Sequence, residues 1–301
     1  MEVLVIVGPT ASGKTAVGIE VARQLNGEIV SADTRQIYRH MDIGTAKPTL
    51  AEQAATPHHM IDVINPDESF DAAQYGTRAA EIIEQILVRG RLPILVGGAG
   101  FYLEALFRGF SPIPRISPEI RSRIQSEADT NLGACYARLA KVDLPTAERF
   151  HPTDRQRVTR ALEVFDETGH TLTSFQAEPR EPATRREATW IGLQRDRQQL
   201  YDRIDLRARL MVELGLEEEV RWLLEAGYGP EMSALRIFGY AEFLDVVKGV
   251  KTREAAAVEM QQATRQYAKR QLSWFRNRVS ELRWIPADEA AEQIVSDLRD
   301  C

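Results

Sequence analysis

The fold is decided by the stretch Glu2-Val-Leu-Val-Ile-Val-Gly-Pro-Thr-Ala-Ser-Gly-Lys-Thr15. Its first half is a β-branched apolar run that ends in glycine, which predicts a buried parallel strand. Residues 8–15 then fit the pattern G-x-x-x-x-G-K-[ST] without a mismatch. Thr15–Leu25 follows with the spacing of an amphipathic helix. A strand, a glycine-rich loop and a helix in this order predict a loop that binds phosphate groups.

The chemistry of such a loop follows from its residue types. Its glycines let the backbone curl so that successive N–H groups point inward, and the helix N-terminus adds positive potential. The Lys14 ammonium adds a full charge, and the Thr15 hydroxyl is placed to bind Mg²⁺, the cofactor we expect. The residues predicted to bind a diphosphate are Gly8, Pro9, Thr10, Ala11, Ser12, Gly13, Lys14 and Thr15.

The other apolar runs complete an α/β pattern. Strands are predicted at Glu28–Ser31, Pro93–Val96 and Ala188–Leu193, and a helix at Phe70–Arg89. Alternating strands and helices predict a P-loop NTPase-like fold, a parallel sheet flanked by helices. The strand Pro93–Val96 ends in Gly97-Gly98 and carries no carboxylate. A motor or a GTPase switch would need one there to complete its metal site.

The pattern changes in the middle of the chain. Prolines punctuate 111–118, and residues 118–173 show only helical periodicity. We therefore expect a P-loop core over 1–112 and 185–301, interrupted by a helical insertion over 113–184. Long amphipathic helices are predicted at 197–226 and 253–280.

A single carboxylate, Asp33, directly follows the second predicted strand. The carboxyl ends of parallel strands face one crevice, so Asp33 should lie near the bound phosphates. It could act as a general base on an acceptor, or it could cap the turn that follows. Its position alone favours neither.

Composition sets outer bounds. The chain has 301 residues and a net charge of −6, and no apolar run is long enough to span a membrane. The N-terminus lacks the pattern of a signal peptide. The two cysteines, Cys135 and Cys301, are far apart, which suits a reducing, cytoplasmic location. His58 and His59 are adjacent, so on a strand they point to opposite faces and are not expected to bind one metal together.

Several motifs together resemble one family. They are Gly8–Thr15, Ser31-Ala-Asp-Thr-Arg-Gln-Ile-Tyr38, Met41-Asp-Ile-Gly-Thr-Ala-Lys-Pro48, Pro57-His-His, Pro93–Gly98, Asp154–Val164 and Thr264–Arg276. In this order, over nearly the whole chain, they resemble the bacterial tRNA dimethylallyltransferases. The resemblance implies transfer of a dimethylallyl group from dimethylallyl diphosphate to N6 of adenosine 37 in tRNA. It also implies a helical insertion that contacts the anticodon arm, and a monomer.

The resemblance assigns roles to individual residues. Asp33 becomes the base that accepts an N6 proton, and Lys14 and Arg207 become the cations on the diphosphate. From the residues alone, Arg207 is better explained as a solvated or salt-bridged helix arginine. The tRNA contacts that the resemblance implies are Asp33, Thr34, Arg35, Gln36, Ala99, Arg121, Gln156, Arg157, Val158, Thr159, Arg160, Arg236, Ile237, Phe238, Gly239, Tyr240, Ala241, Arg265, Gln266, Tyr267, Ala268, Lys269, Arg270, Gln271 and Leu272.

Charge segregation agrees with an RNA partner. Residues 265–283 and 149–160 are each rich in arginine although the chain as a whole is acidic. Either stretch alone is better explained as a solvated helix face. The acidic run Glu217-Glu218-Glu219 is also expected to be solvated.

One residue departs from the family pattern, and three other functions fit parts of the sequence. The family usually has threonine where this chain has Ala99, so one hydroxyl near the reacting adenine is absent. A small-molecule P-loop kinase would share the loop and the carboxylate. A prenyltransferase of free adenine nucleotides would share them too, without a use for the basic stretches. An RNA-binding module would share the basic stretches but would perform no chemistry.

Overall fold

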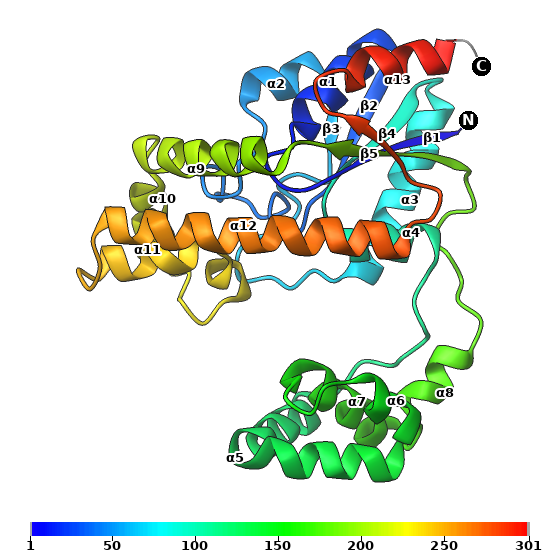
Figure 1. Ribbon diagram of the computed structural model, residues 1–301, viewed down its shortest axis with the longest axis vertical. Coiled ribbons are helices and arrows are strands. Elements are labelled where there is room, and N and C mark those ends of the chain that lie inside the picture. The colour runs from blue at the N-terminus through cyan, green and yellow to red at the C-terminus, as the bar shows by residue number, and fades with distance from the viewer. Residues whose placement is uncertain (1, 300–301) are drawn as a thin grey trace. The chain divides into compact units, whose positions relative to one another are not determined.

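The computed structural model describes residues 2–299 and contains one six-stranded parallel sheet (Figure 1). The strand order is β3-β2-β4-β1-β5-β6. The strands are β1 (Val3–Val7), β2 (Gly27–Ala32), β3 (His58–His59), β4 (Leu92–Gly97), β5 (Ala188–Gln194) and β6 (Arg283–Pro286). The predicted P-loop-like α/β fold is confirmed. The four predicted strands are present, whereas β3 and β6 are too short to have given a periodic signal.

Helices cover both faces of this sheet. Before residue 108 the helices are, in chain order, α1 (Lys14–Gln24), α2 (Leu50–Ala55), α3 (Ala72–Val88) and α4 (Gly100–Phe107). After residue 182 they are α9 (Arg197–Glu213), α10 (Leu216–Glu225), α11 (Tyr240–Val247), α12 (Arg253–Arg278) and α13 (Ala290–Arg299), with a 3₁₀ turn at Ser233–Arg236. The predicted helix 197–226 is therefore two helices. Gly215 has φ +98, a left-handed conformation that glycine adopts readily and other residues do not. It separates the end of the first helix from the start of the second.

Strand alternation divides the core in two. Val3, Val5 and Val7 pack on the side that includes α3 and α4. Leu4 and Ile6 pack on the opposite side, against α1 and α13. Because successive side chains of a strand point to opposite faces, a continuous apolar run fills both cores at once.

Residues 108–182 form a separate compact unit, which starts before and ends before the expected 113–184. It contains α5 (Pro118–Val142), α6 (Leu144–Arg149), α7 (Arg155–Thr168) and α8 (Leu172–Ala177). Its own apolar core includes Ile124, Leu139, Val158 and Leu162. Strands are absent from the 108–182 unit, all of which the structure describes, as the helical periodicity predicted.

Strand register determines where the loops after β1 and β2 leave the sheet. Val7 and Ala32 both lie beside Gly97 of the strand between them. The residues that follow, Gly8 and Asp33, therefore leave the sheet at the same edge. A β-carbon on Gly97 would lie 2.0 Å from the Ala32 carbonyl oxygen, so only glycine allows the two strands to end this close.

Candidate active site

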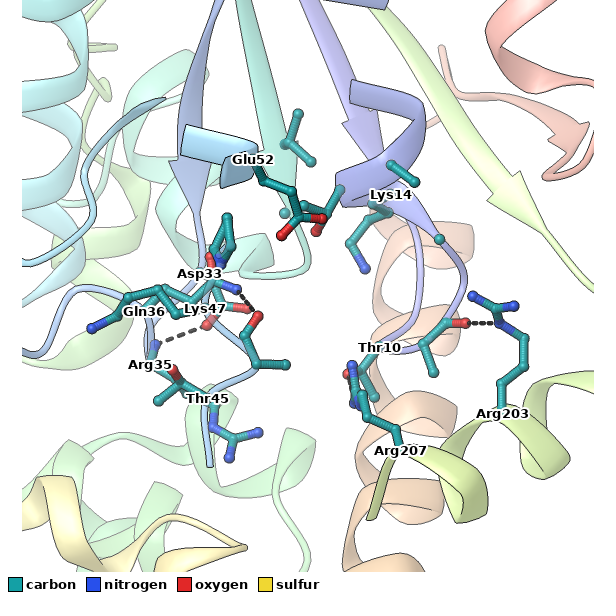
Figure 2. Close-up of a pocket in the computed structure, with 18 of the residues that line it drawn as sticks. Thr10, Lys14, Asp33, Arg35, Gln36, Thr45, Lys47, Glu52, Arg203 and Arg207 are labelled. Atoms are coloured by element: carbon teal, nitrogen blue, oxygen red, sulfur yellow. Dashed lines mark hydrogen bonds between the residues drawn. The ribbon is translucent and has the colours of Figure 1, made fainter. Parts of the chain in front are cut away.

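One cavity of about 390 Å³ lies at the carboxyl ends of β1, β2 and β4 (Figure 2). Lys14 enters it from the start of α1, Asp33 from the loop after β2, and Arg203 and Arg207 from α9. Its remaining walls come from Thr10, Ala11, Gly13, Thr15, Ala16, Arg35, Gln36, Thr45, Ala46, Lys47, Pro48, Glu52, Val96, Gly97, Leu206, Leu210 and Tyr267. Residues from six segments of the chain thus form one polar site.

The Lys14 side chain bonds back to the phosphate loop of residues 8–15, of which it is part. Lys14 donates a hydrogen bond from Nζ to the Pro9 carbonyl at 2.8 Å. Burial lowers the Lys14 pKa to about 8; Asp33 opposes this shift and Arg207 adds to it. Because the ammonium is poorly solvated, a bound diphosphate would stabilise its protonated form and raise the Lys14 pKa. Ala11 adopts φ 64, a left-handed conformation that is unusual for alanine.

Arg207 lies at the same loop. Its guanidinium donates to the Thr10 hydroxyl, and burial, together with Arg35 and Arg203, lowers its pKa to about 10. The sequence alone favoured a solvated or salt-bridged arginine at this position. The solvated explanation is wrong, because Arg207 is desolvated and lines the cavity beside Lys14 and Asp33.

Two more arginines lie at the phosphate loop, and the sequence motifs did not single them out. Arg203 donates through Nε to the Ala11 carbonyl at 2.9 Å, and Arg195 donates through Nε to the Ser12 carbonyl at 3.0 Å. Arg203 precedes Arg207 by one helical turn, and Arg195 follows the end of β5. Both positions carried a usable signal: i,i+4 spacing on one face, and a residue just past a strand.

The Asp33 carboxylate caps the turn that follows it and also lines the cavity. Its Oδ1 accepts the Arg35 main-chain N–H at 2.8 Å, the geometry of a turn cap. The same carboxylate lines the cavity. Tyr267 of α12 also lines it, and burial and the nearby Asp33 raise the Tyr267 pKa to about 12.

The segment 41–48 closes one side of the cavity. Lys47 is almost buried, pairs with Asp62 at 2.6 Å and with Asp42, and donates to the Tyr38 carbonyl at 2.9 Å. The Glu219 carboxylate accepts the main-chain N–H groups of residues 42–44. Tyr240 donates its hydroxyl to the same carboxylate.

The acidic run 217–219 is therefore not solvated as expected. Glu217 is buried and pairs with Arg221 and Arg253, and Glu219 holds the 42–44 backbone. Only Glu218 keeps a side chain that is 64% exposed. Glu218 also pairs with Arg253, so folding brings a partner to each member of the run, which the sequence pattern does not reveal.

The segments predicted to contact tRNA divide into exposed and buried side chains. Those exposed in their own unit are Thr34, Arg121, Gln156, Arg157, Arg236, Gln266, Lys269 and Arg270; Asp33, Gln36, Arg160, Ile237, Phe238, Ala241, Arg265, Tyr267 and Leu272 are partly exposed. Those that point inward are Arg35, Ala99, Val158, Thr159, Gly239, Tyr240, Ala268 and Gln271. Arg35, for example, donates to the carbonyls of Gly44 and Phe238 and stacks on the Phe238 ring.

Ion pairs with acidic residues neutralise part of the positive charge of the two basic stretches. Arg265 pairs with Asp205, Arg278 with Glu104 and Arg283 with Asp297. In the 108–182 unit, Arg155 pairs with Asp129, Arg157 with Asp154 and Arg160 with Glu163. Counting charge along a sequence window misses partners such as Asp205 and Asp129 that lie outside it.

Ala99 lies in the turn after β4. Its N–H donates to the Ala32 carbonyl at 3.0 Å, and its methyl group belongs to the main apolar core. The two histidines of β3 are separate, as expected: His59 bonds Glu28 and His58 bonds the Thr56 carbonyl. Among residues 2–299 we find neither a cluster of three metal-binding side chains nor a helix apolar and long enough to cross a bilayer.

Known proteins resemble this chain over nearly its whole length. A model of the IPP transferase family matches residues 36–278. The tRNA dimethylallyltransferase 1 of Pelobacter propionicus is 45% identical over 301 residues, covering 99% of this chain and 96% of the relative. The tRNA dimethylallyltransferase of Pelotomaculum thermopropionicum is 43% identical over 303 residues, covering 99% and 95%.

Solved structures agree with the sequence relatives. The full-length tRNA isopentenylpyrophosphate transferase of Bacillus halodurans has a TM-score of 0.73 at 37% identity, covering 100% of this chain and 96% of that one. A eukaryotic dimethylallyltransferase acting on tRNA has a TM-score of 0.80 at 28% identity, covering 99% and 77%.

Proposed function

Because the chain belongs to the IPP transferase family, as the resemblance implied, we propose that it transfers a dimethylallyl group from dimethylallyl diphosphate to N6 of adenosine 37 in tRNA. The enzyme is a prenyl transferase of the tRNA dimethylallyltransferase kind. The observation that carries the proposal is the placement of Lys14, Arg207 and Asp33 around one cavity. It supplies cations for a leaving diphosphate and a carboxylate for an acceptor.

The donor side of the reaction builds negative charge. The bond between the allylic carbon and the diphosphate oxygen breaks, and its electron pair stays on the diphosphate. Lys14 and Arg207, which line the cavity, stabilise this charge where it develops, and the N-terminus of α1 adds positive potential. These cations are fixed by contacts to the loop itself, so little reorganisation is needed when the bond breaks.

The acceptor side needs a base. The adenine N6 lone pair is delocalised into the ring, so the amine is a weak nucleophile. As the N6–carbon bond forms, a proton leaves N6 for the Asp33 carboxylate. General-base assistance of this kind contributes about 10²–10⁴-fold to the rate.

Mg²⁺ fits the donors available. The Thr15 hydroxyl lines the cavity, and hard oxygen donors such as this hydroxyl and the oxygens of a diphosphate are what Mg²⁺ prefers. Magnesium usually takes one or two protein ligands and completes its shell with phosphate oxygens and water. When bound, Mg²⁺ would neutralise part of the diphosphate charge.

The acceptor RNA requires a surface outside the cavity. Lys269 and Arg270 on α12 are exposed and suited to phosphates, and Tyr267 on the same helix reaches the cavity. Within the 108–182 unit, Gln156 and Arg157 at the start of α7 are exposed. A base in a single-stranded loop can leave its stack at a cost of a few kcal/mol, which backbone contacts must offset. Since one chain lines the whole cavity, we propose a monomer as the acting unit.

The test is transfer of labelled dimethylallyl from its diphosphate to unmodified tRNA, to AMP, or without acceptor. We expect label in tRNA alone, lost when the N6 position is blocked by methylation. Label in AMP would instead support the prenyltransferase of free adenine nucleotides. Label in neither, with ATP consumed in the presence of a small hydroxy acid, would support the kinase.

A further inference from the structure

Gln271 of α12 lies among the residues expected to contact tRNA, yet its side chain is buried. It is only 6% exposed. Its Oε1 accepts the main-chain N–H of Thr10 at 2.8 Å. Its Nε2 donates to the Gly98 carbonyl at 3.0 Å. The amide thus joins the phosphate loop to the turn after β4.

These two partners fix the orientation of the amide. A main-chain N–H can only donate and a carbonyl can only accept, so the oxygen must face Thr10 and the nitrogen must face Gly98. The fit leaves no spare volume, because a β-carbon on Gly98 would lie 2.0 Å from Nε2. A side chain with both polar ends used and almost no exposed surface is poorly placed to read RNA.

Other ties reach the same loop from α9 and the end of β5. Arg207 donates to the Thr10 hydroxyl, Arg203 to the Ala11 carbonyl and Arg195 to the Ser12 carbonyl. Gln271 is bonded to the main chain of the same segment, from α12. Ala11, which lies in the loop between Thr10 and Ser12, has a left-handed φ of 64. A backbone in a sparsely populated conformation persists only where its surroundings hold it.

We propose that Gln271 is a positioning residue for the donor site. It holds the phosphate loop against the Gly97–Gly98 turn, so that the loop is shaped for a diphosphate before one binds. The inference rests on the proposed function only in taking a prenyl diphosphate as the ligand. Gln271 acts through the loop and does not contact the acceptor RNA.

The experiment measures two affinities separately on the full chain. Binding of dimethylallyl diphosphate and of inorganic pyrophosphate is followed by calorimetry, and binding of an anticodon stem-loop RNA by fluorescence anisotropy without donor. For Gln271→Glu and Gln271→Met we expect about tenfold or greater weakening of both diphosphates, since a buried donor or acceptor loses its partner. RNA affinity should stay within about twofold.

The matched control is Gln266→Glu, the same change at an exposed position one helical turn and a residue earlier on α12. It should leave diphosphate binding unchanged and weaken RNA binding. If Gln271→Glu behaves like Gln266→Glu, the positioning role is wrong. An equal loss of both affinities in the Gln271 variants would also overturn it, because that marks general damage.

A second series guards against misfolding. Gly98→Ala should displace the Gln271 amide and weaken diphosphate binding as much as Gln271→Ala does. The double variant should be no weaker than either single variant, because both remove the same interaction. Additive losses would overturn the shared mechanism. If the unaltered protein binds pyrophosphate but no prenyl diphosphate, the proposed function fails while the Gln271 comparison still stands on pyrophosphate.

Discussion

Glu219 on α10 accepts the main-chain N–H of Ile43 through Oε2 at 2.8 Å, although 176 residues separate them in the chain. The neighbouring N–H groups of Asp42 and Gly44 bond the same carboxylate at 2.8 and 3.1 Å. Three successive N–H groups converging on one anion form a backbone nest. Through it, α10 fixes the segment 41–48 that closes one side of the cavity.

Glu219→Gln should therefore impair transfer without touching substrate. An amide offers a single acceptor oxygen, and its NH₂ group would face main-chain donors, so main-chain N–H groups that are partly buried in the folded protein lose their partner. We expect kcat/KM for the donor to fall about tenfold or more, and the melting temperature to fall as well. Glu218→Gln is the control, because that side chain is 64% exposed and should leave both quantities unchanged.

Asp33→Asn tests the base directly. Asparagine keeps the size of the side chain and can still cap the Arg35 N–H, but it cannot accept the N6 proton. We expect kcat to fall about 10²–10⁴-fold while RNA affinity is kept. Steady-state kinetics and anisotropy distinguish the two quantities. A variant that transfers at the normal rate would leave Asp33 with its capping role alone.

Lys14 should give donor binding a pH dependence. Its pKa is lowered to about 8, first because of burial, so the free enzyme loses the ammonium as pH rises through that value. A bound anion favours the protonated form, so donor affinity should fall above about pH 8 and be flat below it. In Lys14→Met the donor affinity should be weaker at every pH and should not show the fall above about pH 8 that comes from Lys14. Comparing calorimetric affinities of the two proteins from pH 7 to about 10 removes the titration of the ligand itself.

Arg207→Gln should weaken the donor more than the acceptor. Removing a partly desolvated cation beside the diphosphate should lower kcat/KM for the donor about 10²-fold, because electrostatic groups near developing charge carry large effects. Arg209→Gln, on the exposed side of α9, is the matched control and should have little effect. Similar losses in both variants would show that overall charge, and not position, is responsible.

The exposed residues of α12 should govern RNA affinity. Lys269→Gln with Arg270→Gln should weaken stem-loop binding and reduce the slope of log affinity against log salt by about one for each phosphate that is no longer neutralised. Donor affinity should not change. Arg23→Gln, on the exposed surface of α1, provides the comparison. An unchanged salt slope would exclude α12 from the RNA surface.

The sequence by itself determined the elements whose signals are local. The apolar run of β1, the glycine-rich loop and the start of α1 are contiguous, so periodicity and motif spacing located the phosphate site. The parallel topology then brought Asp33 to the same edge of the sheet, because β2 and β1 end beside the same Gly97. The absence of a carboxylate directly after β4 could also be read from adjacent residues in the sequence.

Tertiary structure alone decided which further polar groups hold the phosphate loop. Gln271 bonds Thr10 across 261 residues of chain, and Arg203 bonds Ala11 across 192. Partners such as Asp205 also neutralise arginines that a sequence window counts as free charge. Hydrogen bonds and ion pairs depend on distances of a few ångströms, which packing of distant segments sets and local pattern does not encode.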